Sequence, residues 1–397
     1  MQQPGKYSTG KYHVTILVAV WGIVHAFLFF YYGIRSLYDA KVYIHCADAL
    51  IQDGALEDSH YIFYSVPINL MAFFRRMFPG QLVPYLVFQC VISAFATVAL
   101  YRASAKIFND PKAGLMSGII FLIWWDNIHW NTTAMTESLA CSIICFLILR
   151  LASFKDSIAD YLWIIALLVI AFFTRPTGIL IIVSTIAFLV HYHWHAIRYR
   201  FFWRFVIIPC LFVIAYISAD FMFTRWDFSE QYRKGNIVTY MDDIQGGALY
   251  SESMRIEIDS LVISSDKPPV LRMLFFALDN PVYFLKSAGL KVWYLVSAVR
   301  PYYSTVHNLY ALTWVTLIYI LYYFGWRNTV AGSMRATDST KVFTAVVIVL
   351  NCCLIGISSV DWDNRFYIPM EPGLVLLAGG GAAYSIRVLK SKFVSSR

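Results

Sequence analysis

The stretch IRSLYDAKVYIHCADALIQDGALEDSHYIFYSVPINLMAFFRRMFP, residues 34–79, follows the first long apolar run of the chain. It opens with acids set among apolar and aromatic residues. Residues 38–56 have helical spacing, because steps of four, three and four residues lead from Asp39 to Leu50 along one face. At the first turn of such a helix the macrodipole keeps the Asp39 carboxylate ionised and able to accept a proton. Asp39 is therefore our candidate catalytic residue, with an ordinary N-terminal helix acid as the alternative.

The same stretch ends in an aromatic, amphipathic run that begins near Pro67, a residue well suited to the first turn of a helix. The paired Arg75 and Arg76 are predicted to point away from its apolar face. That face is formed by Leu70, Met71, Phe74, Met77 and Phe78. The pattern predicts a helix that lies in the membrane interface, and a plain buried helix is the alternative.

The composition is that of an integral membrane protein. Of 397 residues, 59% are hydrophobic and only 14% are charged, far from the balance of a soluble domain of this length. The first apolar run is long enough to span a bilayer and has no cleavage site after it, so we expect it to remain as an anchor. The net charge of +8 comes from Lys and Arg at the ends of apolar runs, which indicates topology and not nucleic-acid binding. The seven cysteines contain no CxxC pair and resemble small core residues.

A bilayer core needs about 20 apolar residues in a helix, fewer where the helix is broken or covered by neighbours. Ten candidate spans follow, at about 13–34, 82–101, 113–125, 135–149, 161–173, 177–192, 204–222, 306–324, 342–359 and 369–386. Lys and Arg concentrate on alternate loops and in the C-terminal tail, whereas the short loops of the other side hold only Arg175 and Arg365. This asymmetry predicts that both termini lie in the cytoplasm and that function resides at the outer face.

Residues 282–299 are apolar enough to span, yet counting them would reverse the charge asymmetry of everything after them. We interpret this segment as an interfacial or re-entrant helix. The sequence then predicts one all-α, polytopic transmembrane domain over residues 1–397. It has two sizeable outer regions: residues 35–80 with interfacial helices, and residues 223–305 with the re-entrant segment.

The third outer turn reads WWDNIHWNTTAMTESL over residues 124–139. Asp126 and His129 are three residues apart and are weak candidates for metal ligands, because a third ligand is not evident. Glu137 stands at the outer start of a span, where the helix dipole tolerates an acid. Asn131 opens a glycosylation sequon, which matters only in a eukaryotic secretory compartment.

Two further outer turns carry charge. FFTRPTG places Arg175 at the membrane edge, where a cation needs either a functional ligand or a buried partner such as Glu137 or Asp39. VDWDNRFYIPMEP sets Asp361, Asp363, Arg365 and Glu371 before the last apolar run, and four charges there require a polar cavity or an anionic ligand. Inside that run, Gly379, Gly380 and Gly381 indicate close helix packing better than a phosphate loop.

At several of these positions the chain resembles the GT-C superfamily. Its members are membrane glycosyltransferases that use polyprenyl-phosphate sugars, including protein O-mannosyltransferases and lipid A aminoarabinose transferases. The likeness rests on four places: Asp39 in LYDAKVY, Glu137 in TESL, Arg175 in RPTG and Arg365 in RFYIPMEP. The chain departs from many members in having a single Asp in LYDAK and not an acidic pair. It also departs in having no large C-terminal outer domain.

The resemblance implies inverting transfer of a sugar from a polyprenyl-phosphate donor to an acceptor hydroxyl at the outer face. The acceptor would be a glycolipid, a polysaccharide or a protein of the cell envelope. The short chain without a large soluble domain favours a bacterial inner membrane as the location. Asp39 would be the general base, and cations would stabilise the departing phosphate. The cations are Arg365 and Arg175 first, then Lys286, Lys291 and Arg300; the acids lining the site are Glu137, Asp363, Asp361 and Asp48. A divalent metal is left open as a cofactor.

Two other classes compete with this interpretation. An O-antigen polymerase or ligase would use a lipid-pyrophosphate glycan and centre its chemistry on the later outer region, near Arg300. A lipid or solute transporter would be expected to show related halves and charges near the middle of the membrane, and the sequence shows neither.

Overall fold

The computed structural model describes residues 6–37, 39–56, 58–194, 267–328, 335–361 and 363–395, together with short pieces between 213 and 263. Within this part of the chain the secondary structure is helical, apart from two isolated bridges. The predicted all-α class is confirmed. Contacts divide the chain into two compact units. Unit 1 contains Met1–Leu189, Leu317–Val347 and Ile368–Arg397, and unit 2 contains Val190–Thr316 and Ile348–Tyr367. The prediction of one domain with outer regions 35–80 and 223–305 stays a prediction.

Five helices are long and apolar enough to cross a bilayer. Their apolar segments are Tyr12–Tyr32 of α1 (Lys6–Tyr32), α4 (Val83–Ile107), α16 (Thr305–Arg327), α17 (Arg335–Ile357) and Glu371–Lys392 of α18 (Glu371–Ser395). Four predicted spans coincide with shorter helices: α5 (Pro111–Ile123), α7 (Glu137–Ala152), α8 (Ile158–Thr174) and α9 (Gly178–Tyr192). The one remaining predicted span, at 204–222, falls largely outside the described residues. The segment interpreted as re-entrant forms α15 (Pro281–Ser297), which is not among the candidate spans.

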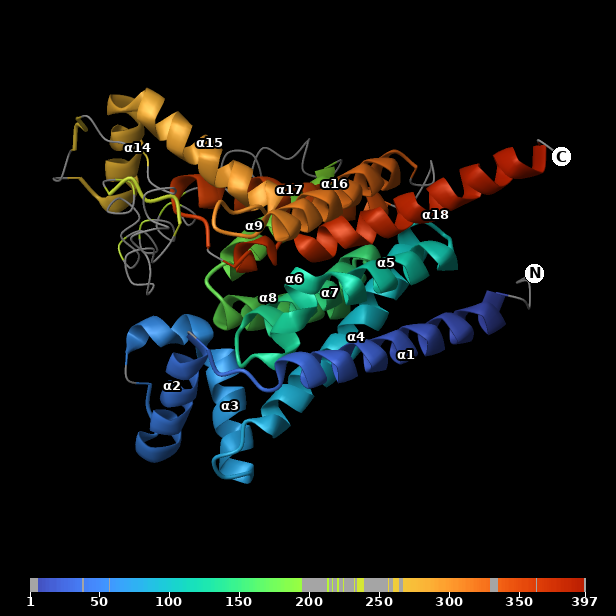
Figure 1. The fold of residues 1–397 in the computed structure, drawn as a ribbon, viewed down its shortest axis with the longest axis horizontal. Coiled ribbons are helices and arrows are strands. Elements are labelled where there is room, and N and C mark those ends of the chain that lie inside the picture. Colours follow the sequence, from blue (N-terminus) through green and yellow to red (C-terminus); the bar gives the residue numbers. More distant parts are fainter. Residues whose placement is uncertain are drawn as a thin grey trace. The chain divides into compact units, whose positions relative to one another are not determined.

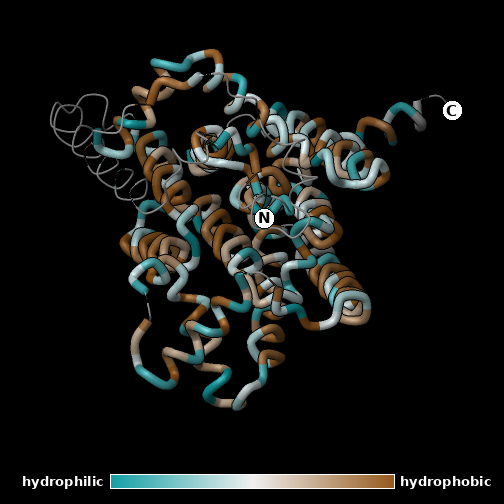
Figure 2. The backbone as a smooth tube through the Cα atoms, turned by 60° about the vertical axis from the view of Figure 1, so that its left-hand side comes forward, coloured by the Kyte–Doolittle hydropathy of each residue, from teal (hydrophilic) through white to brown (hydrophobic). Residues whose placement is uncertain are grey.

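Several helices present large apolar side chains outward. Phe30 is 91% exposed on α1, and Ile158 is 80% exposed on α8. Hydrophobic residues run along the helices, and hydrophilic residues lie mainly at their ends and connections (Figure 2). A soluble protein rarely exposes so much apolar surface, whereas lipid tails cover it without cost. The chain is thus an integral membrane protein.

In unit 1, α4 packs against α5 and α7, α18 packs along α5, and α1 also contacts α5 (Figure 1). Residues 374–378 of α18 are buried on all sides, as expected for a helix that is hydrophobic all round. The predicted role of the glycines is confirmed. A Cβ on Gly379 would overlap Ser117, one on Gly380 would overlap the Phe108 ring, and one on Gly381 would overlap the Leu321 carbonyl.

Local signals set several helix ends. Asp110 accepts from the backbone N–H of Lys112 at 2.9 Å and Pro111 occupies the first turn, which together begin α5. Ser157 and Asp160 form a capping box at the start of α8. Asp160 also pairs with Arg150 at the end of α7, 2.5 Å away, and so joins α7 to α8.

The stretch of residues 34–79 forms α2 (Asp39–Asp53), a short 3-10 turn η1 (Ser59–Tyr64) and α3 (Ser65–Met77). Helices α2 and α3 lie side by side (Figure 1). Pro67 lies in the first turn of α3, as predicted. Of the predicted apolar face, Met71 is buried, whereas Met77 and Phe78 are 59% and 43% exposed. An exposed apolar edge on a short helix is what a membrane-interface position requires.

Unit 2 contains α14 (Pro269–Asp279), α15 and the 3-10 turn η4 (Arg365–Tyr367). Its small core is formed by Tyr232, Met273 and Phe276. Val360 donates its N–H to the carbonyl of Ile237 at 2.9 Å, and Val238 forms a parallel bridge with Val360. The segment that leads to η4 is therefore fixed by backbone contacts.

Candidate active site

Asp39 is the first residue of α2 and is half-buried. The chain just before it is fixed to unit 1, because the N–H of Arg35 donates to the Thr132 carbonyl at 3.0 Å and the Arg35 carbonyl accepts from Ala134 at 3.3 Å. The Arg35 guanidinium lies 3.4 Å from the centroid of the Tyr32 ring. Asp39 thus follows four residues after a point that is held against the loop leading to α7. The structure thus fixes the backbone that precedes the Asp39 carboxylate at the start of α2.

Glu137 is the first residue of α7, and Arg175 follows directly after α8. Both are buried, and Arg175 Nη1 donates to Glu137 Oε1 at 2.7 Å. Thr136 donates its hydroxyl to the other carboxylate oxygen at 3.3 Å. The structure thus contains the buried pair that was the alternative to a ligand-binding Arg175. A charge-assisted bond in a protein interior orders both side chains.

The sequon residue Asn131 forms a buried junction of helices. Its Nδ2 donates to His25 Nε2 at 2.8 Å and to Ser93 Oγ at 3.0 Å, and its Oδ1 accepts from the Ser138 hydroxyl. His25 is on α1, Ser93 on α4 and Ser138 on α7, so one amide connects three helices to the loop η2 (His129–Thr132). Asn131 is 3% exposed, and the folded protein cannot offer it for glycosylation. No sequence pattern signalled this role.

Asp126 and His129 were the weak metal candidates. His129 Nδ1 bonds to the Trp125 carbonyl at 2.8 Å, and its ring lies 4.3 Å from that of Trp130. Burial among these rings lowers the pKa of His129 to about 4. Among the described residues, no three His, Cys, Asp or Glu side chains gather closely enough to hold a metal ion.

Asp48, a predicted site-lining acid on α2, pairs with Arg75 on α3. The Nε and Nη2 atoms of Arg75 donate to the two carboxylate oxygens at 2.8 and 2.9 Å. This two-pronged contact joins α2 to α3 and has the geometry that is specific to arginine. The predicted Arg75 direction, away from the apolar face, is explained by this partner.

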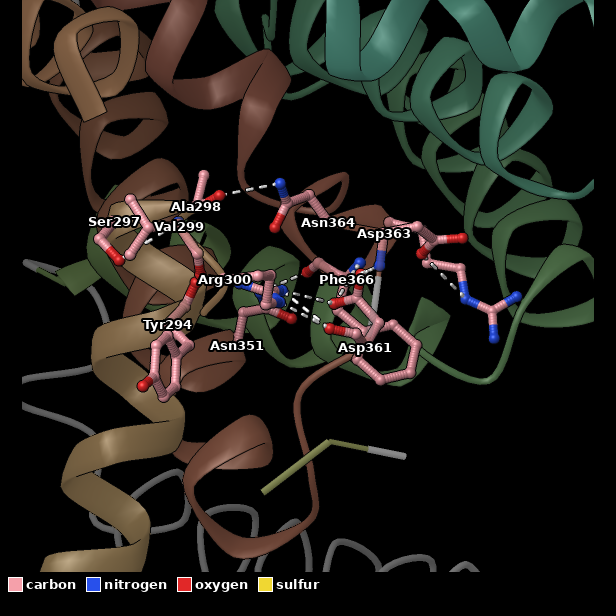
Figure 3. A network of polar contacts seen from close by, with 11 residues as sticks. Tyr294, Ser297, Ala298, Val299, Arg300, Asn351, Asp361, Asp363, Asn364 and Phe366 are labelled. Carbon is pink, nitrogen blue, oxygen red and sulfur yellow. Dashed lines mark hydrogen bonds and ion pairs between the residues drawn. The ribbon is translucent and has the colours of Figure 1, made fainter. Parts of the chain in front are cut away.

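In unit 2, Arg300 and Asp361 are completely buried. The Nε and Nη2 atoms of Arg300 donate to the Asp361 carbonyl at 3.0 and 2.8 Å, and Nη1 donates to the carbonyls of Tyr294 and Val299 at 2.6 and 2.8 Å (Figure 3). The nearest carboxylate oxygen of Asp361 is farther away, at 3.7 Å. Arg300 therefore contacts mainly backbone carbonyls.

Asp363 and Arg365 follow in the same turn. Arg365 Nε lies 3.8 Å from Asp363 Oδ1, and the Arg365 guanidinium lies 5.7 Å from the centroid of the Phe366 ring. The Asp361 carboxylate accepts from the N–H of Asp363 and from the N–H of Phe366, each at 3.2 Å. The structure thus places Arg300 against the turn that contains Asp361, Asp363 and Arg365.

The two lysines of α15 differ sharply. Lys286 is exposed. Lys291 is fully buried, donates to the Ser358 carbonyl at 2.6 Å and lies 3.4 Å from the centroid of the Tyr232 ring. Burial lowers the pKa of Lys291 well below its usual range.

The fold defines an all-helical integral membrane protein that holds carboxylates and guanidiniums at helix ends. Within that class, residues 66–218 match the model of the dolichyl-phosphate-mannose-protein mannosyltransferase family. This match confirms the predicted resemblance and supports a membrane glycosyltransferase of the GT-C type. Glu137 and Arg175 lie inside the matched region, whereas Asp39 and Arg365 lie outside it. No curated protein and no solved structure matches the chain.

Proposed function

We propose that the chain transfers a sugar from a polyprenyl-phosphate-linked donor to an acceptor hydroxyl at the outer face of the membrane. The observation that carries the proposal is the family match over residues 66–218, since that family is named for a lipid-phosphate-linked sugar donor, dolichyl-phosphate-mannose. Helices of spanning length provide the membrane location that such a donor needs. We extend the inference to both termini lying in the cytoplasm, as the distribution of Lys and Arg favours.

In this reaction the acceptor oxygen attacks the anomeric carbon and the bond from that carbon to the phosphate oxygen breaks. The configuration inverts because the displacement is direct. Asp39 takes the hydroxyl proton, and the donor leaves as the polyprenyl phosphate. The position of Asp39 at the start of α2, four residues after the fixed backbone of Arg35, supports this role.

The leaving phosphate gains negative charge, which preorganised cations stabilise. We assign this role to Arg365 first and to Arg175 second, because Arg175 already shares a short bond with Glu137.

The test uses purified protein in detergent with a polyprenyl-phosphate sugar and measures donor binding and sugar transfer separately. Asp39→Asn should bind the donor with unchanged affinity and lose transfer by about 10²–10⁴-fold, the usual contribution of a general base. Asp53→Asn is the matched control, because Asp53 is an exposed Asp at the other end of the same helix. Full transfer by Asp39→Asn would refute the assignment of the base, and absence of transfer by the unaltered chain from any lipid-phosphate sugar would refute the function.

A further inference from the structure

Residues 358–361 and 363–366 of unit 2 are held by α15 and by the residues directly after it. Lys291 binds the Ser358 carbonyl, and Arg300 binds the Asp361 carbonyl with two N–H groups. Asn364 donates its amide to the Ala298 carbonyl at 3.0 Å (Figure 3). The turn that carries Arg365 is therefore attached to the end of α15 at several points.

The hydrogen-bond donors of the Arg300 guanidinium are used by backbone carbonyl groups of the protein itself. Four hydrogen bonds of 2.6 to 3.0 Å lead from its guanidinium to the carbonyls of Asp361, Tyr294 and Val299. Its own backbone is fixed too, because Arg300 N–H donates to Asn308 Oδ1 at 2.9 Å and the Asn308 amide donates to the Arg300 carbonyl at 2.8 Å. The planar guanidinium of arginine presents several N–H donors in fixed directions that match these carbonyls. The single ammonium group of a lysine cannot form the same set of hydrogen bonds.

Asp361 connects its contact with Arg300 to the residues that follow it in the chain. Its carboxylate accepts from the N–H groups of Asp363 and Phe366, which closes the turn around Arg365. Both sides of the contact also adopt left-handed backbone, with φ of +56° at Ala298 and +64° at Asn364. Such a conformation is costly for alanine and persists only where the surroundings over-determine it.

We propose that Arg300 and Asp361 form a positioning clamp, defined by these two residues, which fixes the turn that contains Asp361 and residues 363–366 and thereby sets the position of the Arg365 guanidinium. They are positioning residues and do not contact the donor. The inference rests on the proposed function in one respect, the binding of the donor phosphate by Arg365. Burying an Arg–Asp pair is costly in itself, so its use is best explained by the specific geometry that it enforces.

The clamp itself is tested without any activity, by hydrogen exchange of the full chain in detergent, read in peptides that cover residues 358–367. Arg300→Gln and the milder Asp361→Asn should raise exchange of the Asp363 and Phe366 amides, the former by about tenfold or more. Arg272→Gln is the matched control, since Arg272 is in the same unit and, among the residues that the structure describes, donates a single long hydrogen bond, to the Lys267 carbonyl at 3.4 Å. Unchanged protection in Arg300→Gln would overturn the clamp.

Its link to Arg365 is tested by a double-mutant cycle in kcat/KM for sugar transfer. Arg300→Gln should cost about 10²-fold in the unaltered chain, the effect of misplacing a group by about 1 Å, and less than threefold when Arg365 is already alanine. Arg300→Lys should fail to rescue, whereas a direct phosphate ligand would tolerate lysine as a point charge. Equal losses in both backgrounds would overturn the positioning role. Full transfer by Arg365→Ala would instead refute the phosphate role of Arg365 and the link with it, while the exchange result still decides whether the clamp exists.

Discussion

Replacing Glu137 by Gln should leave Arg175 buried opposite a neutral amide. The side chains of the pair are 2% and 8% exposed and their atoms are 2.7 Å apart, so water cannot take the place of the lost carboxylate charge. Removing one partner of a buried pair costs about 3–5 kcal/mol. In a membrane the unfolded reference finds partners of its own, so we expect the lower limit, about 3 kcal/mol. That loss corresponds to roughly two powers of ten in the unfolding equilibrium.

The assay is unfolding in one detergent for the unaltered chain, Glu137→Gln, Arg175→Gln and the double variant. The double variant should lose at least about 1 kcal/mol less than the sum of the single losses, because residues in contact couple. Arg76→Gln, an exposed arginine on α3, is the control and should be neutral. Additive losses would refute the pairing. Donor affinity then separates the two roles of Arg175: a phosphate contact predicts weaker binding in Arg175→Gln than in Glu137→Gln.

Three other measurements test the fold. Gly381→Ala should destabilise the protein by about 1–3 kcal/mol, because the added Cβ would overlap the Leu321 carbonyl. Gly22, a helical glycine, has open space around it, so Gly22→Ala should stabilise the protein by about 0.5–1 kcal/mol in the same melts. Equal effects of the two substitutions would contradict the packing. Asn131 should remain unglycosylated in a eukaryotic host, as a glycosidase mobility assay would show, and a glycan on folded protein would contradict its burial. The pKa of His129 is lowered to about 4 from 6.5, so its contribution to stability should be complete above pH 6.5 and decline as pH falls toward 4. In His129→Phe the melting temperature should therefore depend less on pH across that window. An unchanged loss of melting temperature on the acid side would contradict the assignment.

Much of the fold could be predicted from the sequence because the relevant signals are local. Apolar length marked the long spans, Pro67 marked the first turn of α3, and three successive glycines indicated where helices approach closely. Each of these depends on a few neighbouring residues and on the thickness of a bilayer. The short helices α5 and α7 were also predicted, because charges and turn residues bound their apolar runs.

The partners of the charged residues could not be predicted in the same way. Asp48 and Arg75 are 27 residues apart, and Arg300 reaches a carbonyl 61 residues away, so both contacts depend on how helices and turns pack. A sequence shows that Arg300 is a cation at the end of an apolar segment, which favoured a phosphate role. It does not show that backbone carbonyls surround the guanidinium.

The bridge between Arg35 and Thr133 has a consequence for how this protein can vary. Because the backbone just before Asp39 takes its location from the loop ahead of α7, the length of the connection between α2 and α3 does not determine where that carboxylate stands. Insertions, deletions or exchanges after Asp53 would change the surface that α2 and α3 present and leave the backbone before Asp39 in place. Under the proposed function, changes in this connection would therefore leave the position of the proposed base unaltered.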